Sequence, residues 1–243
     1  MLMKKIACRL MSLSCLTVAV ALAGCSIQFP QSGVRHLFNF ERRNRSYLEV
    51  APVFENGIGK AFTDDSRGIP SICLTEEEAF EVISLEAQGA GINFIQNALE
   101  LSGLRLPDLL ENQRIMPGKN AESFTLDGYD AENKVGFEFV SQEDMNNWSL
   151  KSTSPDKFSE LADTLALAYS LSEGLGDVEG KGTVAAFYEP EVNYSEEEYL
   201  LLKKTCQNDP EALAHKLKEI EKEYLRMQVR DFLNWLGDSS PSG

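Results

Sequence analysis

Hydrophobic positions recur every three or four residues in four segments of the chain, which is the spacing of an amphipathic helix. These segments are residues 74–85, 154–174, 195–205 and 209–236. Thr75 with Glu78, and Ser195 with Glu198, have the spacing of a capping box, which satisfies backbone N–H groups at the start of a helix. We therefore predict four helices over these segments and a further helical turn after Ser141.

The last predicted helix is unusually long. At about 1.5 Å per residue, the segment from Asp209 to Leu236 spans about 40 Å. Its apolar side chains form one stripe, at Leu213, Leu217, Ile220, Tyr224, Val229, Phe232 and Leu236. A small domain needs less length than this to cover its own core, so the helix either packs along the whole body or offers one end to a partner.

The segment from Ser123 to Val140 alternates apolar and polar residues, which is the period of a β-strand. Residues 130–133 supply turn chemistry in its middle, so we predict a hairpin. Residues 92–106 fit a strand or a helix and are assigned to strands, and residues 183–188 form a β-branched and aromatic strand. Without regular βαβ alternation, this mixture predicts the α+β class: a small antiparallel sheet built around the hairpin and packed by several helices, including the long C-terminal one.

The first 24 residues have the three-part pattern of a secretory signal. They carry Lys4, Lys5 and Arg9 and no acid, and an apolar run from Leu10 to Leu22 follows. A run of about 13 residues is short for a membrane-spanning helix, which needs about 20. The pattern therefore predicts export.

Leu22-Ala23-Gly24-Cys25 resembles the lipobox of bacterial lipoprotein precursors. The resemblance implies cleavage between Gly24 and Cys25, loss of residues 1–24, and attachment of a diacylglycerol to the Cys25 thiol. Two or three acyl chains, such as palmitate, hold a protein on a membrane durably. The implied location is the cell envelope: the outer membrane in a cell with two membranes, otherwise the outer face of the plasma membrane. The alternative is an ordinary secretory signal cut near Ala23.

These features predict the organisation of the chain. We expect a signal peptide at 1–24, a lipid anchor, tether and basic segment at 25–47, a single α+β domain at 48–238 and a disordered tail at 239–243. The basic segment contains Arg35, Arg42, Arg43 and Arg45. These arginines either contact anionic lipid head groups or pair with acids of the body, and the abundance of acids favours pairing.

The chain is strongly acidic, with 23 Lys and Arg against 38 Asp and Glu and a net charge of −15. Loss of the three basic residues of the signal leaves 20 against 38, a net charge of −18. Such a body repels nucleic acid, so we expect no nucleic-acid partner. Once the signal is removed and Cys25 is lipidated, only Cys73 and Cys206 remain as thiols. They either form a disulfide, worth about 4 kcal/mol across so long a loop, or stay as buried thiols.

Asp127, Asp130 and Glu138 place three carboxylates at the predicted hairpin turn and on the strand after it. Such a set can hold a divalent cation, and it resembles in degraded form the nuclease pattern of a hairpin Asp followed by Glu-x-Lys. Here Phe139 and Val140 follow the Glu, so the Lys that stabilises the attacking water is missing. The alternative, which we favour, is a turn whose polar side chains bond the backbone.

Other catalytic patterns are incomplete. Residues 56–60 lack the glycine spacing of a phosphate loop. Ser154-x-x-Lys157 matches only the serine and lysine of penicillin-recognising enzymes and lacks their Lys-Thr-Gly element. His36 and His215 are at opposite ends of the chain, which gives a histidine metal site or a Ser-His-Asp relay little support.

The sequence therefore predicts a lipid-anchored extracytoplasmic bacterial protein whose domain binds an envelope protein or a small ligand, with no cofactor and no catalysis. The alternative is a metal-assisted hydrolase that uses Asp127, Asp130 and Glu138. The hairpin strand around Glu138 and the strand that ends before Pro190 resemble uncharacterised exported bacterial proteins, and this resemblance implies no activity.

Overall fold

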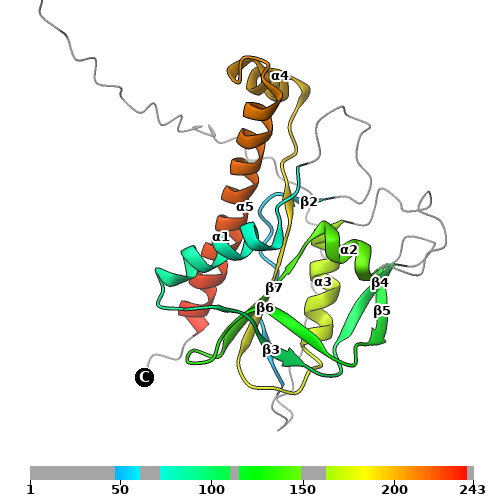
Figure 1. Cartoon of the computed structure of the whole chain (residues 1–243). Coiled ribbons are helices and arrows are strands. Elements are labelled where there is room, and N and C mark those ends of the chain that lie inside the picture. The colour runs from blue at the N-terminus through cyan, green and yellow to red at the C-terminus, as the bar shows by residue number, and fades with distance from the viewer. Residues whose placement is uncertain (1–46, 61–71, 110–114, 149–162, 240–243) are drawn as a thin grey trace, which may run out of the picture. The chain divides into compact units, whose positions relative to one another are not determined.

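The computed structural model describes residues 47–60, 72–109, 115–148 and 163–239, and these form an α+β fold (Figure 1). The strands are β1 (Glu49–Val50), β2 (Ile58–Gly59), β3 (Ile95–Leu101), β4 (Arg105–Leu109), β5 (Ile115–Asn120), β6 (Phe124–Asp130), β7 (Val135–Val140), β8 (Thr183–Tyr188) and β9 (Pro190–Glu191). The helices are α1 (Glu76–Gln88), α2 (Gln142–Trp148), α3 (Thr164–Leu175), α4 (Glu196–Thr205) and α5 (Pro210–Ser239). The predicted fold class is confirmed.

The central sheet has the strand order β1-β8-β7-β6-β3. The predicted hairpin is confirmed, because β6 pairs antiparallel with β7, with Asp130 opposite Val135. β3 also pairs antiparallel with β6, whereas β8 runs parallel to both β7 and β1. The sheet is therefore mixed, which corrects the expectation of a purely antiparallel one. α2 and α3 lie between β7 and β8 in the sequence, and a connection of this length permits parallel pairing.

Helices cover both faces of the sheet, so every residue of β7 and β8 is buried. On one face, Val140 and Tyr188 pack with Leu171 of α3. On the other face, Phe137 and Phe187 pack with side chains of α1 and α5. The two faces therefore form two separate hydrophobic clusters with the sheet between them.

Local capping residues fix most helix starts. The predicted capping boxes of α1 and α4 are both present, and Ser141 caps α2 together with Asp144. α3 begins at Thr164 with the extended residue Asp163 as its cap, so the predicted helix over 154–174 is not continuous; its predicted start at residue 154 lies outside the described residues. At the other end of the chain, α5 includes Ser239, which the sequence had assigned to the tail.

α5 packs mainly on α1 and the sheet. Leu225, Val229 and Phe232 join the cluster that also contains the aromatic side chains of β7 and β8. Nearer its start, Leu213 and Leu217 form a smaller cluster with Ile72 and side chains of α4. No helix within the described ranges is long and apolar enough to span a membrane. Cys25 and the arginines at 35–45 lie outside those ranges.

Candidate functional site

Polar groups gather where the parallel strands β7 and β8 end, which is the side of a parallel sheet where ligands commonly bind. Glu189 follows β8 directly and is 0% exposed. Its Oε1 accepts hydrogen bonds from the Leu74 N–H (2.9 Å) and the Lys60 ammonium (3.1 Å). Its Oε2 accepts one from the Gln142 N–H (3.0 Å). One carboxylate thus joins β8 to the starts of α1 and α2.

Lys60 is shared between two buried carboxylates. Its Nζ lies 3.1 Å from Glu189 Oε1 and 3.1 Å from Glu221 Oε1 on α5. Burial by itself would lower the pKa of Lys60, but the two carboxylates outweigh it and raise that pKa above its ordinary value. Burial raises the pKa of Glu221 to about 8, an effect that Lys60 opposes. The cluster is closed, since the ammonium already contacts three carboxylate oxygens.

Asp127 and Glu138 face each other across the hairpin at the point where regular pairing of β6 with β7 stops. The Asp127 N–H donates to Glu138 Oε2 (3.2 Å), and the Phe139 N–H donates to Asp127 Oδ2 (2.7 Å). Each carboxyl group thus replaces a backbone carbonyl that the broken ladder no longer supplies. The predicted pair is brought together by the structure, and its observed contacts are with the backbone.

Two further carboxyl groups, Glu76 on α1 and Asp144 on α2, lie near this pair. Burial raises the pKa of Asp127 to about 7, and Asp144 adds to the effect. Burial likewise raises the pKa of Glu76 to about 8 and that of Glu138 well above its usual range, with Asp127 and Asp144 contributing to both. Carboxyl groups with pKa values of about 7 and 8, as at Asp127 and Glu76, can exchange protons near neutral pH. The cluster therefore has the acidity for proton transfer, while the contacts of Asp127 and Glu138 serve the fold.

Asp130 belongs to a different environment. It lies at the turn, three residues or about 10 Å along β6 from Asp127. Its carboxylate accepts hydrogen bonds from the N–H groups of Asn93, Glu132 and Asn133 and from the Asn133 side chain. Burial would raise the pKa of Asp130, but these hydrogen bonds lower it to about 2.

The geometry does not support the predicted metal site at Asp127, Asp130 and Glu138. Asp130 is engaged in the turn, as the alternative interpretation expected. Within the described residues, no group of three or more His, Cys, Asp or Glu side chains is arranged to hold a metal ion. His215 is exposed on α5, and His36 lies outside the described ranges.

The two cysteines considered for a disulfide are thiols in the structure. The Cys73 thiol donates to Gln142 Oε1 (3.0 Å), and Cys206 packs with the cluster of Leu213 and Leu217. Pairing of the cysteines stays a prediction, which thiol titration of the intact protein tests. Two titratable thiols would contradict it.

Sequence reasoning missed Lys60, Glu189 and Glu221 as a cluster. A signal was available, because Glu189 directly follows a strand of buried residues. Glu221 also lies on the buried stripe of α5, four residues after Leu217 and four before Leu225. An acid on an apolar stripe indicates a buried partner, but periodicity cannot say which residue that partner is.

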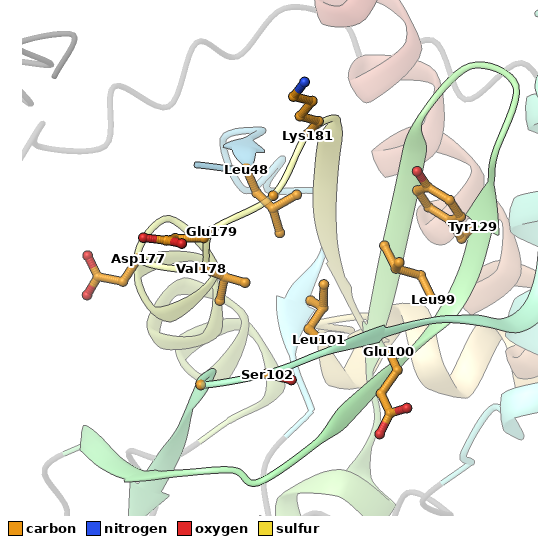
Figure 2. Close-up of a pocket in the computed structure, with 12 residues that line it drawn as sticks. Leu48, Leu99, Glu100, Leu101, Ser102, Tyr129, Asp177, Val178, Glu179 and Lys181 are labelled. Atoms are coloured by element: carbon orange, nitrogen blue, oxygen red, sulfur yellow. The ribbon is translucent and has the colours of Figure 1, made fainter. Parts of the chain in front are cut away.

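A surface hollow of about 520 Å³ lies at the opposite end of the parallel strands. In Figure 2, the side chains of Leu48, Leu101 and Val178 lie near its middle, while the carboxylates of Asp177 and Glu100 point outward on different sides. The volume is in the range of small-ligand sites. Its other lining residues are Leu99, Ser102, Gly103, Tyr129, Glu179, Gly180 and Lys181. The hollow therefore has an apolar centre, and the carboxylates of Asp177 and Glu100 point away from it.

The chain matches no protein-family model, no curated protein and no solved structure.

Proposed function

We propose that this protein is a lipid-anchored extracytoplasmic bacterial protein whose α+β domain binds a partner or a small ligand. The observation that carries the proposal is the sequence Leu22-Ala23-Gly24-Cys25, which follows a short apolar run and three basic residues. Small residues at 23 and 24 let an extended backbone enter a protease groove. The thiol at 25 is the group that takes the lipid.

Binding rather than catalysis is supported by how the buried charges are used. Lys60 contacts two carboxylates, and Glu189 accepts two backbone N–H groups besides that lysine. Asp127 and Glu138 accept backbone N–H groups from each other's strands. These bonds join segments of the fold to each other, and the hollow at the other end of the sheet has the size of a ligand site.

The anchor is tested by metabolic labelling of the full chain with a fatty acid in a bacterial host. We expect the wild-type chain to carry the label and to sediment with membranes, and the Cys25→Ala variant to lose the label. Cys15→Ala is the matched control, because that cysteine lies in the signal and should leave labelling unchanged. An unlabelled wild-type chain with the mass of a bare polypeptide would refute the anchor.

A thermal melt separates binding from metal-assisted hydrolysis. A metal ion at 100 times its dissociation constant stabilises the folded state by about 2.7 kcal/mol. We expect no shift of Tm with millimolar Ca²⁺, Mg²⁺ or Zn²⁺. A shift in the wild-type protein that Asp127→Asn abolishes would favour the hydrolase instead.

A further inference from the structure

α4 presents an apolar face that the described fold leaves exposed. Leu200 is 54% exposed and Leu201 is 64% exposed, although both lie in the middle of the helix. The opposite face is the one in contact, through Tyr199, Leu202 and, just after the helix, Cys206, which pack on the small cluster at the start of α5. Figure 1 shows α4 at the outer end of α5, beyond the central sheet.

Charged residues flank the two leucines at helical spacing. Glu197, Leu200, Leu201 and Lys204 follow the i, i+3, i+4, i+7 pattern, so at 3.6 residues per turn they share one face of about 100°. Glu197 and Lys204 are both exposed. Seven residues, or about 10 Å of helix, separate them, so they flank the leucines from the two ends of the face.

This face is complementary to itself when a second helix is laid against it in the opposite direction. A two-fold axis between residues 200 and 201 places Leu200 opposite Leu201 of the other copy, and Glu197 opposite its Lys204. An interface with two-fold symmetry requires this reciprocity, since residue i must contact j while j contacts i. The acidic first turn of α4, Glu196–Glu198, would repel an anionic membrane surface.

We propose that α4 is a self-association surface, where two copies of the chain pair as antiparallel helices through Leu200 and Leu201. Glu197 and Lys204 of each copy form ion pairs with the other copy and fix the antiparallel direction. One pair of ten-residue helices is smaller than a standard interface of about 1,200–2,000 Å², so the association is weak and reversible. The proposal rests on α4 alone and does not depend on the lipid anchor.

The test is disulfide trapping of the full chain in cells, followed by a non-reducing gel. The background is Cys206→Ser, which removes the thiol just after α4 and supplies the baseline. We expect Leu201→Cys to give a dimer band well above this baseline, because an axis between residues 200 and 201 displaces the two copies of residue 201 by only about 1.5 Å along the helices. Leu85→Cys is the matched control, because Leu85 on α1 is also 64% exposed and should give no dimer.

Charge exchange then tests the direction of pairing. Glu197→Lys or Lys204→Glu in the Leu201→Cys chain creates two like-charge contacts per dimer, and we expect roughly tenfold less trapping at low salt. The double variant restores both ion pairs and should trap within about twofold of the parent. The double variant also places a positive charge near the start of α4 and a negative charge near its end, and both oppose the helix dipole. If the single substitutions reduced trapping only by destabilising α4, the double variant would therefore trap less than either of them.

Three results would overturn the proposal. They are no dimer above the baseline, no recovery in the double variant, and trapping of Leu201→Cys to a protein of different mass. Loss of the fatty-acid label alone would refute the anchor and leave the dimer band in place, so the two proposals fail separately.

Discussion

At the scale of single residues, the Lys60 ammonium offsets the energetic cost of burying the carboxyl groups of Glu189 and Glu221. Glu189 is 0% exposed, Glu221 is 6% exposed, and both contact the Lys60 ammonium. Removing the lysine leaves two buried carboxyl groups without their cation, and breaking a buried ion pair in this way typically costs about 3–5 kcal/mol. We therefore expect Lys60→Met to lower the free energy of unfolding by about that amount, measured by urea denaturation at pH 7.

The control for this prediction is a lysine whose ion pairs are only partly buried. Lys222 lies 3.6 Å from Glu78 and 3.3 Å from Glu219, and these two partners are 27% and 41% exposed, so Lys222→Met should change the free energy of unfolding by less than about 1 kcal/mol. Adding Glu221→Gln to Lys60→Met removes one of the two buried carboxyl groups left without a cation and should recover part of the loss. Equal effects of the two lysine substitutions would contradict the closed cluster.

The carboxyl cluster predicts an unusual dependence of stability on pH. Burial, helped by Asp144, raises the pKa of Asp127 to about 7 in the folded state, against about 3.9 in an unfolded chain. Between these values the folded protein holds a proton that the unfolded chain has lost, so the free energy of unfolding falls as pH rises from about 4 to 7. Glu76 and Glu138, with raised pKa values, act in the same direction.

Asp127→Asn should remove this part of the pH dependence, because the amide stays neutral while its oxygen still accepts from the Phe139 N–H. At pH 8 we expect the variant to be about 1–2 kcal/mol more stable than wild type, after allowing for solvent screening.

Asp130→Asn is the control, and its effect on stability should have the opposite sign. Hydrogen bonds lower the pKa of Asp130 to about 2, so it stabilises the fold above pH 4 and its loss should destabilise the protein at neutral pH. Urea denaturation of both variants from pH 5 to 8 measures these differences, and equal pH slopes for wild type and Asp127→Asn would contradict the prediction.

At the scale of elements, local signals predicted more than long-range ones. The capping boxes of α1 and α4 depend on residues three apart, and the alternation in β6 and β7 is local as well, so the sequence alone revealed them. The parallel pairing of β7 with β8 joins residues almost fifty positions apart, and no local pattern encodes it. The Lys60 cluster was hidden for the same reason, since its bonds join residues 129 and 161 positions apart. The candidate acids at 127 and 138 were found, but only the structure shows that they replace backbone partners.

The contact of β6 with β7 depends on a glycine. A methyl group at Gly128 would overlap the ring of Phe137 on the neighbouring strand. That ring is 0% exposed and packs edge-on against Phe94, with a centroid distance of 4.8 Å, so it has little room to move. We expect Gly128→Ala to lower the free energy of unfolding by about 1–3 kcal/mol through overpacking, measured by urea denaturation.

Gly237→Ala is the control for this substitution. A methyl group there meets no atom within 4 Å, and the residue is helical, so alanine should leave stability unchanged or raise it by up to about 1 kcal/mol. If Gly128→Ala were as stable as wild type, the described packing of the Phe137 ring would be wrong.

At the scale of the whole molecule, basic side chains of α5 are used to hold α1. Lys218 contacts Glu78, and Arg230 makes two hydrogen bonds of 3.0 Å to Glu86. Because these cations are already paired, they neutralise acids of α1 and leave the excess of acidic residues elsewhere uncompensated. With 38 acids against 23 bases, the folded chain holds this excess in a smaller volume than the unfolded chain, so self-repulsion opposes folding.

This excess predicts that salt stabilises the protein. Raising NaCl from about 0.02 to 0.2 M shortens the screening length from above 20 Å to below 10 Å, which weakens long-range repulsion more than contacts at 3 Å. Screening also weakens surface ion pairs, but each contributes only about 0–1 kcal/mol. We therefore expect Tm to rise by a few degrees with NaCl at pH 8. Near pH 5, where carboxylates begin to take up protons and the net charge falls, the same addition should change Tm much less. A Tm that falls with salt at pH 8 would mean that the ion pairs between α1 and α5 outweigh the repulsion of the whole chain.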